Sequence, residues 1–346
     1  MSSAPELSIA GRRIGPRHAP LVIAEIGINH EGSFEKALFM IDDAAAAGCE
    51  CVKFQTHVIE DEMVPNGVVP GNARESIWEI MNRCALSEAD ERRLKAHAEQ
   101  RGLIFLSTPF SRAAADRLER IGVAAYKIGS GECNNYPLIE HIAAFGKPVI
   151  LSTGMNNLES VAPAVDILRR RRVPFALLHC TSIYPTPYSA VRLGALRQLA
   201  DAFPDAVVGL SDHSATIYPC LGAAALGASI LERHFTSSKD WPGPDIPISM
   251  TPAELRELIA GSRAIHEALG GAKDILPGEA PTIQFAYASV VALRDIAAGE
   301  PLSMENVWVK RPGTGEIRAA ELPRVLSRRA LRSFKKDEQL VWSSLQ

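Results

Sequence analysis

The sequence predicts an α/β protein built around a (β/α)8 TIM barrel, because short apolar runs recur with helical patterns between them. Fully buried parallel strands form continuous apolar runs, and strands that alternate with helices indicate parallel βαβ units. Eight such units in about 270 residues match a barrel better than a doubly wound open sheet, the competing fold. The runs cover residues 21–27, 51–57, 103–110, 124–130, 148–155, 175–184, 206–214 and 229–236.

The segments between the runs carry helix start and stop signals. Ser33 can cap a helix that runs to Ala47. Ser87 begins a capping-box-like sequence for another helix, which stops near Gly102. A long insertion at residues 58–86 separates the second run from this helix, and long loops after barrel strands are usually lids or binding loops.

The alternation of strands and helices stops after residue 275, where Pro277, Gly278 and Pro281 interrupt the pattern. We therefore expect residues 1–275 to form the barrel domain and residues 276–285 to form a linker. Residues 286–346 then form a small C-terminal domain.

Composition excludes several classes of function. The 346 residues are 47% hydrophobic and 22% charged, with a formal net charge of -3. The chain therefore lacks the dominant basic face of a nucleic-acid or membrane-surface binder. Its N-terminus lacks the order of a signal peptide, and no run of about 18 apolar residues predicts a membrane span. Six cysteines without CxxC spacing are expected to be free thiols, which predicts a cytoplasmic location.

Polar side chains occur at the C-terminal end of every predicted strand, where a barrel holds its active site. Burying so many polar groups without partners is costly, so a ligand, a metal or mutual pairing must offset that cost. We therefore expect one functional site that takes side chains from all eight strands. These strand-end residues are Glu25, Lys53, Gln55, Ser107, Thr108, Lys127, Ser130, Glu132, Ser152, Thr153, His179, Thr181, Tyr184, Ser211, Asp212, His213, Glu232, Arg233 and His234.

The lysines and histidines of this set each admit two roles. Lys53 and Lys127 could form a Schiff base, as in an aldolase, but the nearby serines and Gly-Ser-Gly backbone favour an anion cradle. His213 and His234 end neighbouring strands, so they could hold a divalent metal with open positions or form a hydrogen-bonded pair. Cys180 is interpreted as a packing residue, because the sequence shows no clear base that would activate the thiol.

The same residues resemble the sialic acid synthase family, and the match runs in order from about residue 8 to the end of the chain. Each motif alone is weak, but the combination is highly specific, and the likeness is strongest to the bacterial N-acetylneuraminate synthases. The last motif resembles the antifreeze-like (SAF) domain of that family, which we therefore expect at the C-terminus. The motifs are residues 25–32, 52–56, 107–110, 126–132, 151–155, 183–187, 209–213, 232–236, 243–245 and 308–313.

The resemblance implies an activity, a cofactor and an assembly. Phosphoenolpyruvate, N-acetylmannosamine and water would give N-acetylneuraminate and phosphate, with a divalent ion of the manganese type, or magnesium or cobalt in its place. It also implies a homodimer in which the antifreeze-like domain of one subunit covers the barrel mouth of the other.

The resemblance also implies a role for each site residue. His213 and His234 are the implied metal ligands, while Lys53 and Lys127 stabilise the carboxylate and phosphate throughout the reaction. Glu25 would bind a sugar hydroxyl or act as an acid/base, Glu132 would handle the proton near C2, and Arg311 of the partner subunit would reach the N-acyl group of the sugar. The remaining implied contacts are Asn72, Thr108, Ser130, Ser152, Ser182 and Tyr184 to phosphoenolpyruvate, and Gln55, Asp245 and Phe285 to the acylated sugar.

Ser182 departs from the family pattern, because an asparagine often follows Cys-Thr at this position. The shorter side chain would lose a contact to phosphoenolpyruvate or make it through water. Related synthases use diacetamido sugars to make legionaminic or pseudaminic acid, and the phosphoenolpyruvate residues cannot discriminate among sugars. A non-enzymatic sugar-binding module is a further alternative, because the tail resembles ice-binding proteins.

Overall fold

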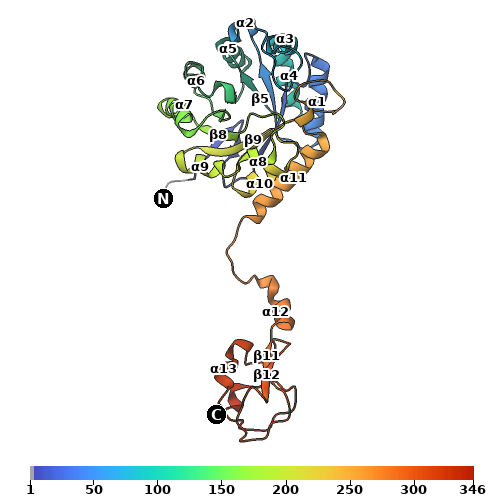
Figure 1. Ribbon diagram of the computed structural model, residues 1–346, viewed down its shortest axis with the longest axis vertical. Helices are drawn as coiled ribbons and strands as arrows, with labels where there is room; N and C mark the ends of the chain where they lie inside the picture. The colour runs from blue at the N-terminus through green and yellow to red at the C-terminus, as the bar shows by residue number, and fades with distance from the viewer. Residues whose placement is uncertain (1–3) are drawn as a thin grey trace. The chain divides into compact units, whose positions relative to one another are not determined.

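The computed structural model describes residues 4–346, which divide into two compact units (Figure 1). The first unit ends at Gly270 and contains a single eight-stranded parallel sheet. The second unit comprises Gly271–Gln346 and is built around a two-stranded antiparallel sheet.

The eight strands of the first unit form a nearly closed barrel. Their order in the sheet is β5-β4-β3-β10-β9-β8-β7-β6, and the two end strands, β5 and β6, pack side by side. The predicted barrel is therefore confirmed, and each strand falls inside one of the eight predicted runs. The strands are β3 (Leu21–Gly27), β4 (Cys51–Thr56), β5 (Ile104–Pro109), β6 (Tyr126–Ile128), β7 (Val149–Ser152), β8 (Phe175–Cys180), β9 (Val207–Asp212) and β10 (Ile230–His234).

Helices surround the barrel and return the chain from the end of one strand to the start of the next (Figure 1). The capping predictions are confirmed, because Ser33 and Ser87 accept hydrogen bonds from the first turns of α1 and α4. The surrounding helices are α1 (Phe34–Ala46), α4 (Glu88–Gln100), α5 (Arg112–Ile121), α6 (Tyr136–Ala143), α7 (Leu158–Arg170), α8 (Tyr188–Val191), α9 (Ala195–Ala202), α10 (Tyr218–Ala225) and α11 (Pro252–Ala268).

The insertion at residues 58–86 contains two helices that the sequence analysis did not predict, α2 (Ile59–Glu62) and α3 (Ile77–Cys84). A capping box between Ser76 and Glu79 begins α3. Its buried face packs on Ile28, just after the first barrel strand. The insertion is thereby held against the mouth of the barrel.

The bottom of the barrel is closed by an N-terminal hairpin of β1 (Leu7–Ile9) and β2 (Arg12–Ile14). Its apolar side chains join a fully apolar cluster with the lower residues of the barrel strands. Leu21, Ile150 and Ile230 belong to this cluster and have no exposed surface. Burial of these side chains drives closure at this end, since each buried aliphatic side chain contributes roughly 1.5–3 kcal/mol.

The second unit has its own apolar core around β11 (Ser289–Ala292) and β12 (Val307–Lys310). The predicted linker, residues 276–285, holds the short 3-10 helix Pro277–Glu279 and most of α12 (Ala280–Ala286). The Glu279 carboxylate accepts a hydrogen bond from the Leu276 amide, which closes this turn. Near the C-terminus lies the short helix α13 (Leu322–Val325).

Within residues 4–346, every helix is too short or too polar to cross a membrane.

Candidate active site

A cavity of about 350 Å³ opens at the C-terminal ends of the barrel strands. Most of the predicted site residues line it, and they come from all eight strands or the loops that follow them. The structure therefore brings both lysines and both histidines to one cavity. The predicted residues in its lining are Glu25, Lys53, Gln55, Thr108, Lys127, Ser130, Glu132, Ser152, Ser182, Tyr184, Ser211, His213, Glu232 and His234.

The two lysines are buried and bonded to different partners. Lys53 Nζ lies 2.6 Å from Glu25 Oε2 and donates to Thr108 Oγ1 at 3.0 Å. Lys127 Nζ donates to Ser152 Oγ at 2.7 Å and to the Ile128 carbonyl at 3.2 Å. These contacts fix the two ammonium groups on the cavity wall, where they form a cationic end of the site.

Glu232 joins the two lysines; the sequence analysis expected it among the strand-end residues of the site but gave it no specific role. Its Oε1 lies 3.9 Å from Lys53 Nζ and 3.5 Å from Lys127 Nζ, and it accepts from Ser211 Oγ at 3.1 Å. Glu232 and His234 are two residues apart on β10, so they point to the same face of the strand. The expectation that Glu232 and Ser211 belong to the site is therefore confirmed, and the period of two explains why each faces the cavity with the histidine two residues further on.

Burial and this carboxylate act on the lysines in opposite directions. Burial alone would lower the pKa of Lys53, but Glu232 and Glu25 raise it above its ordinary value. For Lys127 burial prevails and lowers the pKa, although Glu232 opposes it. Burial would raise the pKa of Glu232, but the two lysines lower it, so this carboxylate is charged.

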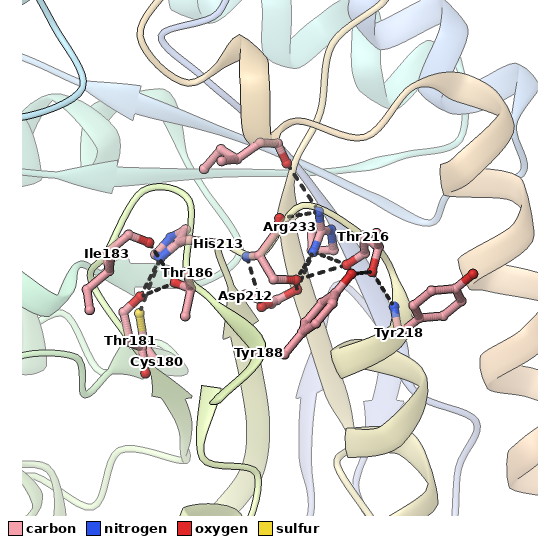
Figure 2. Close-up of polar contacts among 12 residues, drawn as sticks. Cys180, Thr181, Ile183, Thr186, Tyr188, Asp212, His213, Thr216, Tyr218 and Arg233 are labelled. Atoms are coloured by element: carbon pink, nitrogen blue, oxygen red, sulfur yellow. Dashed lines mark hydrogen bonds and ion pairs between the residues drawn. The ribbon is translucent and has the colours of Figure 1, made fainter. Parts of the chain in front are cut away.

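The two histidines lie side by side in the lining of the same cavity, at a position that we call the histidine end. Their ring centroids are 5.5 Å apart, and Tyr184 stacks on His213 at 4.1 Å. His213 Nδ1 lies 3.0 Å from the Thr181 carbonyl oxygen, to which it donates (Figure 2). This bond leaves Nε2 of His213 as the acceptor nitrogen. The Nδ1 atom of His234 is buried and has no hydrogen-bond partner among residues 4–346.

Six strand-end residues predicted to join the site do not line the cavity, namely Ser107, Thr153, His179, Thr181, Asp212 and Arg233. The buried Arg233 pairs with Asp212 and donates to the carbonyl oxygens of Ser214 and Ile248 at 2.9 and 3.1 Å (Figure 2). The expectation that all polar strand ends converge is wrong for these six, because neighbouring residues of a strand face opposite sides. The pair of Arg233 and Asp212 has a structural role, since it connects β9, β10 and the loops beside them.

The interpretation of Cys180 as a packing residue is incomplete. Its Sγ lies 3.9 Å from His213 Nδ1, and the side chain lines the cavity. Burial would raise its pKa, but the contact with His213 lowers it below the ordinary value. Side chains two residues apart in an extended segment point to the same face, and Cys180 and Ser182 both line the cavity. The alternation along β8 and into the following loop could therefore have indicated that Cys180 faces the cavity.

Glycines shape the wall beside Ser130. The Gly154 amide donates to Ser130 Oγ at 3.0 Å. A side chain at residue 154 would place its Cβ only 2.5 Å from Ser182 Oγ and 2.7 Å from Ser130 Oγ. The cavity therefore keeps a polar recess of hydroxyl groups and a backbone amide there, which suits an anion.

Glu132 lies on the same side of the cavity as Ser130. Burial, together with the nearby Glu62, raises the pKa of Glu132 to about 7. A carboxyl group with such a pKa exchanges a proton near neutral pH, as a general acid or base must.

Gln55 lies beside Glu25, the partner of Lys53, whereas Asn72 and Asp245 lie near His234. Gln55 Nε2 donates to Glu25 Oε1 at 3.2 Å. Asn72 Nδ2 donates to Asp245 Oδ1 at 3.2 Å, and Asp245 Oδ2 lies 3.7 Å from His234 Nδ1. Burial raises the pKa of Asp245 to about 6. Asn72, predicted to contact phosphoenolpyruvate, is therefore placed with the predicted sugar residue Asp245.

Phe285 and Arg311 belong to the second unit, so the barrel cavity described above does not include them. Phe285 lies on α12 with 62% of its surface exposed. Arg311 is exposed directly after β12. Their predicted contacts with the sugar remain predictions.

A (β/α)8 barrel that gathers buried lysines, histidines and carboxylates in one cavity at its strand ends has the organisation of a barrel enzyme. Comparisons with known proteins agree. Residues 40–274 match the NeuB family, and residues 287–346 match the SAF domain.

Relatives match nearly the whole chain. The N,N'-diacetyllegionaminic acid synthase of Campylobacter jejuni is 37% identical, over 92% of this chain and 98% of its own length. The human N-acetylneuraminate-9-phosphate synthase is 34% identical, over 87% of this chain and 85% of its own length. The crystal structure of the sialic acid synthetase of Leptospira borgpetersenii in complex with citrate covers 81% of this chain and 95% of its own, with 32% identity and a TM-score of 0.74.

The chain therefore belongs to the NeuB family. It is an enzyme of the transferase type, a phosphoenolpyruvate-dependent nonulosonate synthase. This excludes the non-enzymatic alternative, and the SAF match accounts for the predicted antifreeze-like domain.

Proposed function

We propose that this enzyme condenses phosphoenolpyruvate with N-acetylmannosamine and water to give N-acetylneuraminate and phosphate. The observation that supports this most is the combination of groups in one cavity. Two buried lysines line it at what we call the lysine end, and two histidines, one of them beside a buried aspartate, also line it. The lysines suit an anionic donor, and the histidines suit a neutral carbonyl acceptor.

Phosphoenolpyruvate would bind at the lysine end. Lys53 and Lys127 would neutralise its carboxylate and phosphate, and both are already held in place by Thr108 and Ser152. Ser130, whose Oγ accepts from the Gly154 amide, would donate its own hydroxyl proton to the phosphate. Fixed donors need no reorganisation as the charge shifts during the reaction.

The acylated sugar would bind at the histidine end, with its aldehyde toward the donor. Gln55 and Asp245 would bind sugar hydroxyls, Tyr184 would cover one face, and Asn72 would hold Asp245 in place. We also propose that Phe285 and the partner subunit's Arg311 complete this end in a homodimer. Mixing a Lys53→Met variant with an Arg311→Ala variant tests the dimer, because mixed dimers would regain activity at one intact site.

In the proposed reaction, C3 of phosphoenolpyruvate attacks the aldehyde carbon, and the aldehyde oxygen takes up a proton. Water then adds to C2 and loses a proton, and the C2–O bond to phosphate breaks. Glu132 is our candidate for the proton taken from water, because its pKa lies near neutral pH. Glu25 is the second candidate, since its carboxylate is held between Lys53 and Gln55.

The residues at the histidine end fit a divalent metal. His234 Nδ1 is buried without a hydrogen-bond partner in the described chain, and His213 keeps Nε2 free by donating through Nδ1. Residues 4–346 contain no cluster of three or more ligands, so a metal here would keep positions for water and substrate. We propose that His213 and His234 hold such an ion, manganese above magnesium or cobalt. When bound, it would polarise the acceptor carbonyl as a Lewis acid.

A phosphate-release assay tests the function. The wild-type enzyme should release phosphate only when phosphoenolpyruvate, N-acetylmannosamine and a divalent metal are all present. Metal affinity should be measured separately by titration of Mn²⁺, and His213→Ala should abolish that binding. Release with a 2,4-diacetamido sugar but not with N-acetylmannosamine would instead establish a legionaminic or pseudaminic acid synthase, as the name of the Campylobacter relative suggests.

The Schiff-base alternative is tested with borohydride. Lys53 is in contact with two carboxylates, which raise its pKa and make it a poor nucleophile. Treatment with borohydride during turnover should therefore leave the mass of the enzyme unchanged. An adduct on Lys53 or Lys127 would overturn the proposed chemistry.

We also propose a cytoplasmic location for this enzyme. The six cysteines, all within the part of the chain that the structure describes, are free thiols. Free buried thiols are typical of proteins from a reducing compartment. The location of a tagged chain after cell fractionation would test this.

A further inference from the structure

A second cavity, of about 570 Å³, lies beside the proposed acceptor end of the site. Glu31 after β3, Asn72 and Arg83 of the insertion, and Gly243 after β10 contribute to its lining. The carboxylate of Asp245 separates the two cavities, because one oxygen accepts from Asn72 and the other lies 3.7 Å from His234. A substrate with its aldehyde at His234 would have to extend past Asp245 to reach this second cavity.

Glu31 gives the second cavity its chemical character. Its side chain is only 12% exposed, and one oxygen pairs with Arg83, whose guanidinium also lies 2.9 Å from Glu75. The other oxygen, Oε1, is buried and has no hydrogen-bond partner in residues 4–346. Two carboxylates therefore hold Arg83, whereas Glu31 still has a free acceptor that a hydroxyl donor would satisfy.

Gly243 keeps the approach to this oxygen free of side chains. A Cβ at residue 243 would lie 3.1 Å from Glu31 Oε1. The φ angle of Gly243 is +140°, which also favours glycine. At this residue the loop after β10 thus places backbone alone, and no side chain, against this buried oxygen.

We propose that this cavity is a subsite for the hydroxyl-bearing end of the acceptor sugar, and that Glu31 selects neutral sugars against phosphorylated ones. The inference rests on the proposed function and adds the substrate class of that site. A partly buried carboxylate attracts hydroxyl donors and repels a phosphate dianion. Arg83 divides its charge between Glu31 and Glu75, and Arg74 is exposed to water at the rim, where its charge is screened.

Such a selection matters within this family. The name of the human relative describes a 9-phosphate product, whereas the name of the Campylobacter relative describes none. Both kinds of acceptor are therefore used by related barrels. A charged residue at the far end of the acceptor is a simple means of discriminating between them.

The test compares the wild type with Glu31→Gln at saturating phosphoenolpyruvate. Phosphate release is measured with N-acetylmannosamine and with its 6-phosphate. Glu31→Gln should raise KM for the neutral sugar about tenfold, as expected for loss of a charge-assisted hydrogen bond. It should also shift the kcat/KM ratio at least about tenfold toward the phosphorylated sugar, while KM for phosphoenolpyruvate stays constant. Glu35→Gln makes the same chemical change on the exposed first turn of α1 and should shift neither value.

Each outcome decides one of the two proposals. An unchanged ratio in a folded Glu31→Gln variant, or a wild type that prefers the 6-phosphate, overturns the role of Glu31. If the wild type is active only with a diacetamido sugar, the proposed function is overturned. If Glu31→Gln then also has an unchanged KM for that diacetamido sugar, the proposed subsite is overturned as well. Should Glu31→Gln not fold, Gly243→Ala places a methyl group against the same carboxylate and should raise the sugar KM alone.

Discussion

The two ends of the barrel are built by the same eight strands but bury opposite kinds of side chain. At the bottom, the N-terminal hairpin and the lower strand residues form a wholly apolar cluster. At the top, the same strands bury Lys53, Lys127 and Glu232 around a cavity. The bottom gains free energy from burial, whereas the top gives some of it up to hold charges in fixed positions. Stability and chemistry are therefore separated along the barrel axis, and substitutions at the two ends should have separable effects.

His213→Ala should give the largest effect on activity. Removal of this imidazole takes away one of two proposed metal ligands and the ring on which Tyr184 stacks. We expect turnover to fall by about 10³-fold or more, which corresponds to at least about 4 kcal/mol. Phosphate release measures the activity, and circular dichroism should show an intact fold.

The control for this substitution is His97→Ala on α4, far along the chain from any strand end. It should keep wild-type turnover. If His213→Ala retained normal turnover, His213 would not be a metal ligand that the reaction requires.

Ile9→Ala tests the opposite end. Ile9 has no exposed surface and packs in the apolar cluster of the hairpin. Its truncation should lower the free energy of unfolding by about 3 kcal/mol, through lost burial and a residual cavity. Denaturant unfolding measures this, and the turnover of folded enzyme should not change. Ser8→Ala, on the exposed face of the same strand, is the matched control.

Glu91 tests the cost of a buried carboxylate that lies outside the cavity. It is buried on α4, both its oxygens lack hydrogen-bond partners in the described residues, and burial raises its pKa to about 7. The folded state therefore binds the proton more tightly than the unfolded state does. The stabilisation that comes from protonated Glu91 is fully present below the unfolded pKa of about 4.5 and is lost as pH rises through the folded pKa of about 7. The loss amounts to about 3 kcal/mol at pH 8.

Glu91→Gln should remove this pH dependence and leave turnover unchanged. Denaturant unfolding of wild type and variant between pH 4.5 and 8 measures the difference. Glu99→Gln, the same change on an exposed position of α4, should keep the wild-type dependence. Identical curves for the wild type and Glu91→Gln would show that Glu91 is not the group responsible.

Glu132 has the same raised pKa as Glu91 but lies in the cavity, so its titration should appear in activity. Below pH 7 the carboxyl group is protonated and cannot accept the proton of water. We expect Glu132→Gln to lower kcat about 10²-fold and to abolish the rise in activity through pH 7. A variant that keeps this rise would exclude Glu132 as the base.

The sequence alone was sufficient for the barrel, because fully buried parallel strands must be apolar and the helices between them must be amphipathic. It also predicted that most polar strand ends share one cavity, since the fold class brings those ends together. The short helix α3 was missed, because its stability depends on packing against Ile28, a contact far away in the sequence.

Only the tertiary structure decided what the strand-end residues contact and at what distance. Arg233 and Asp212 look like Lys53 in the sequence, yet a half-turn of the strand directs them outward to each other. Glu232 acquires its importance from two lysines on other strands, and Glu31 from an oxygen left without a partner under a distant loop. Such properties depend on distances of a few ångströms between segments far apart in the chain, and local sequence patterns carry no information about them.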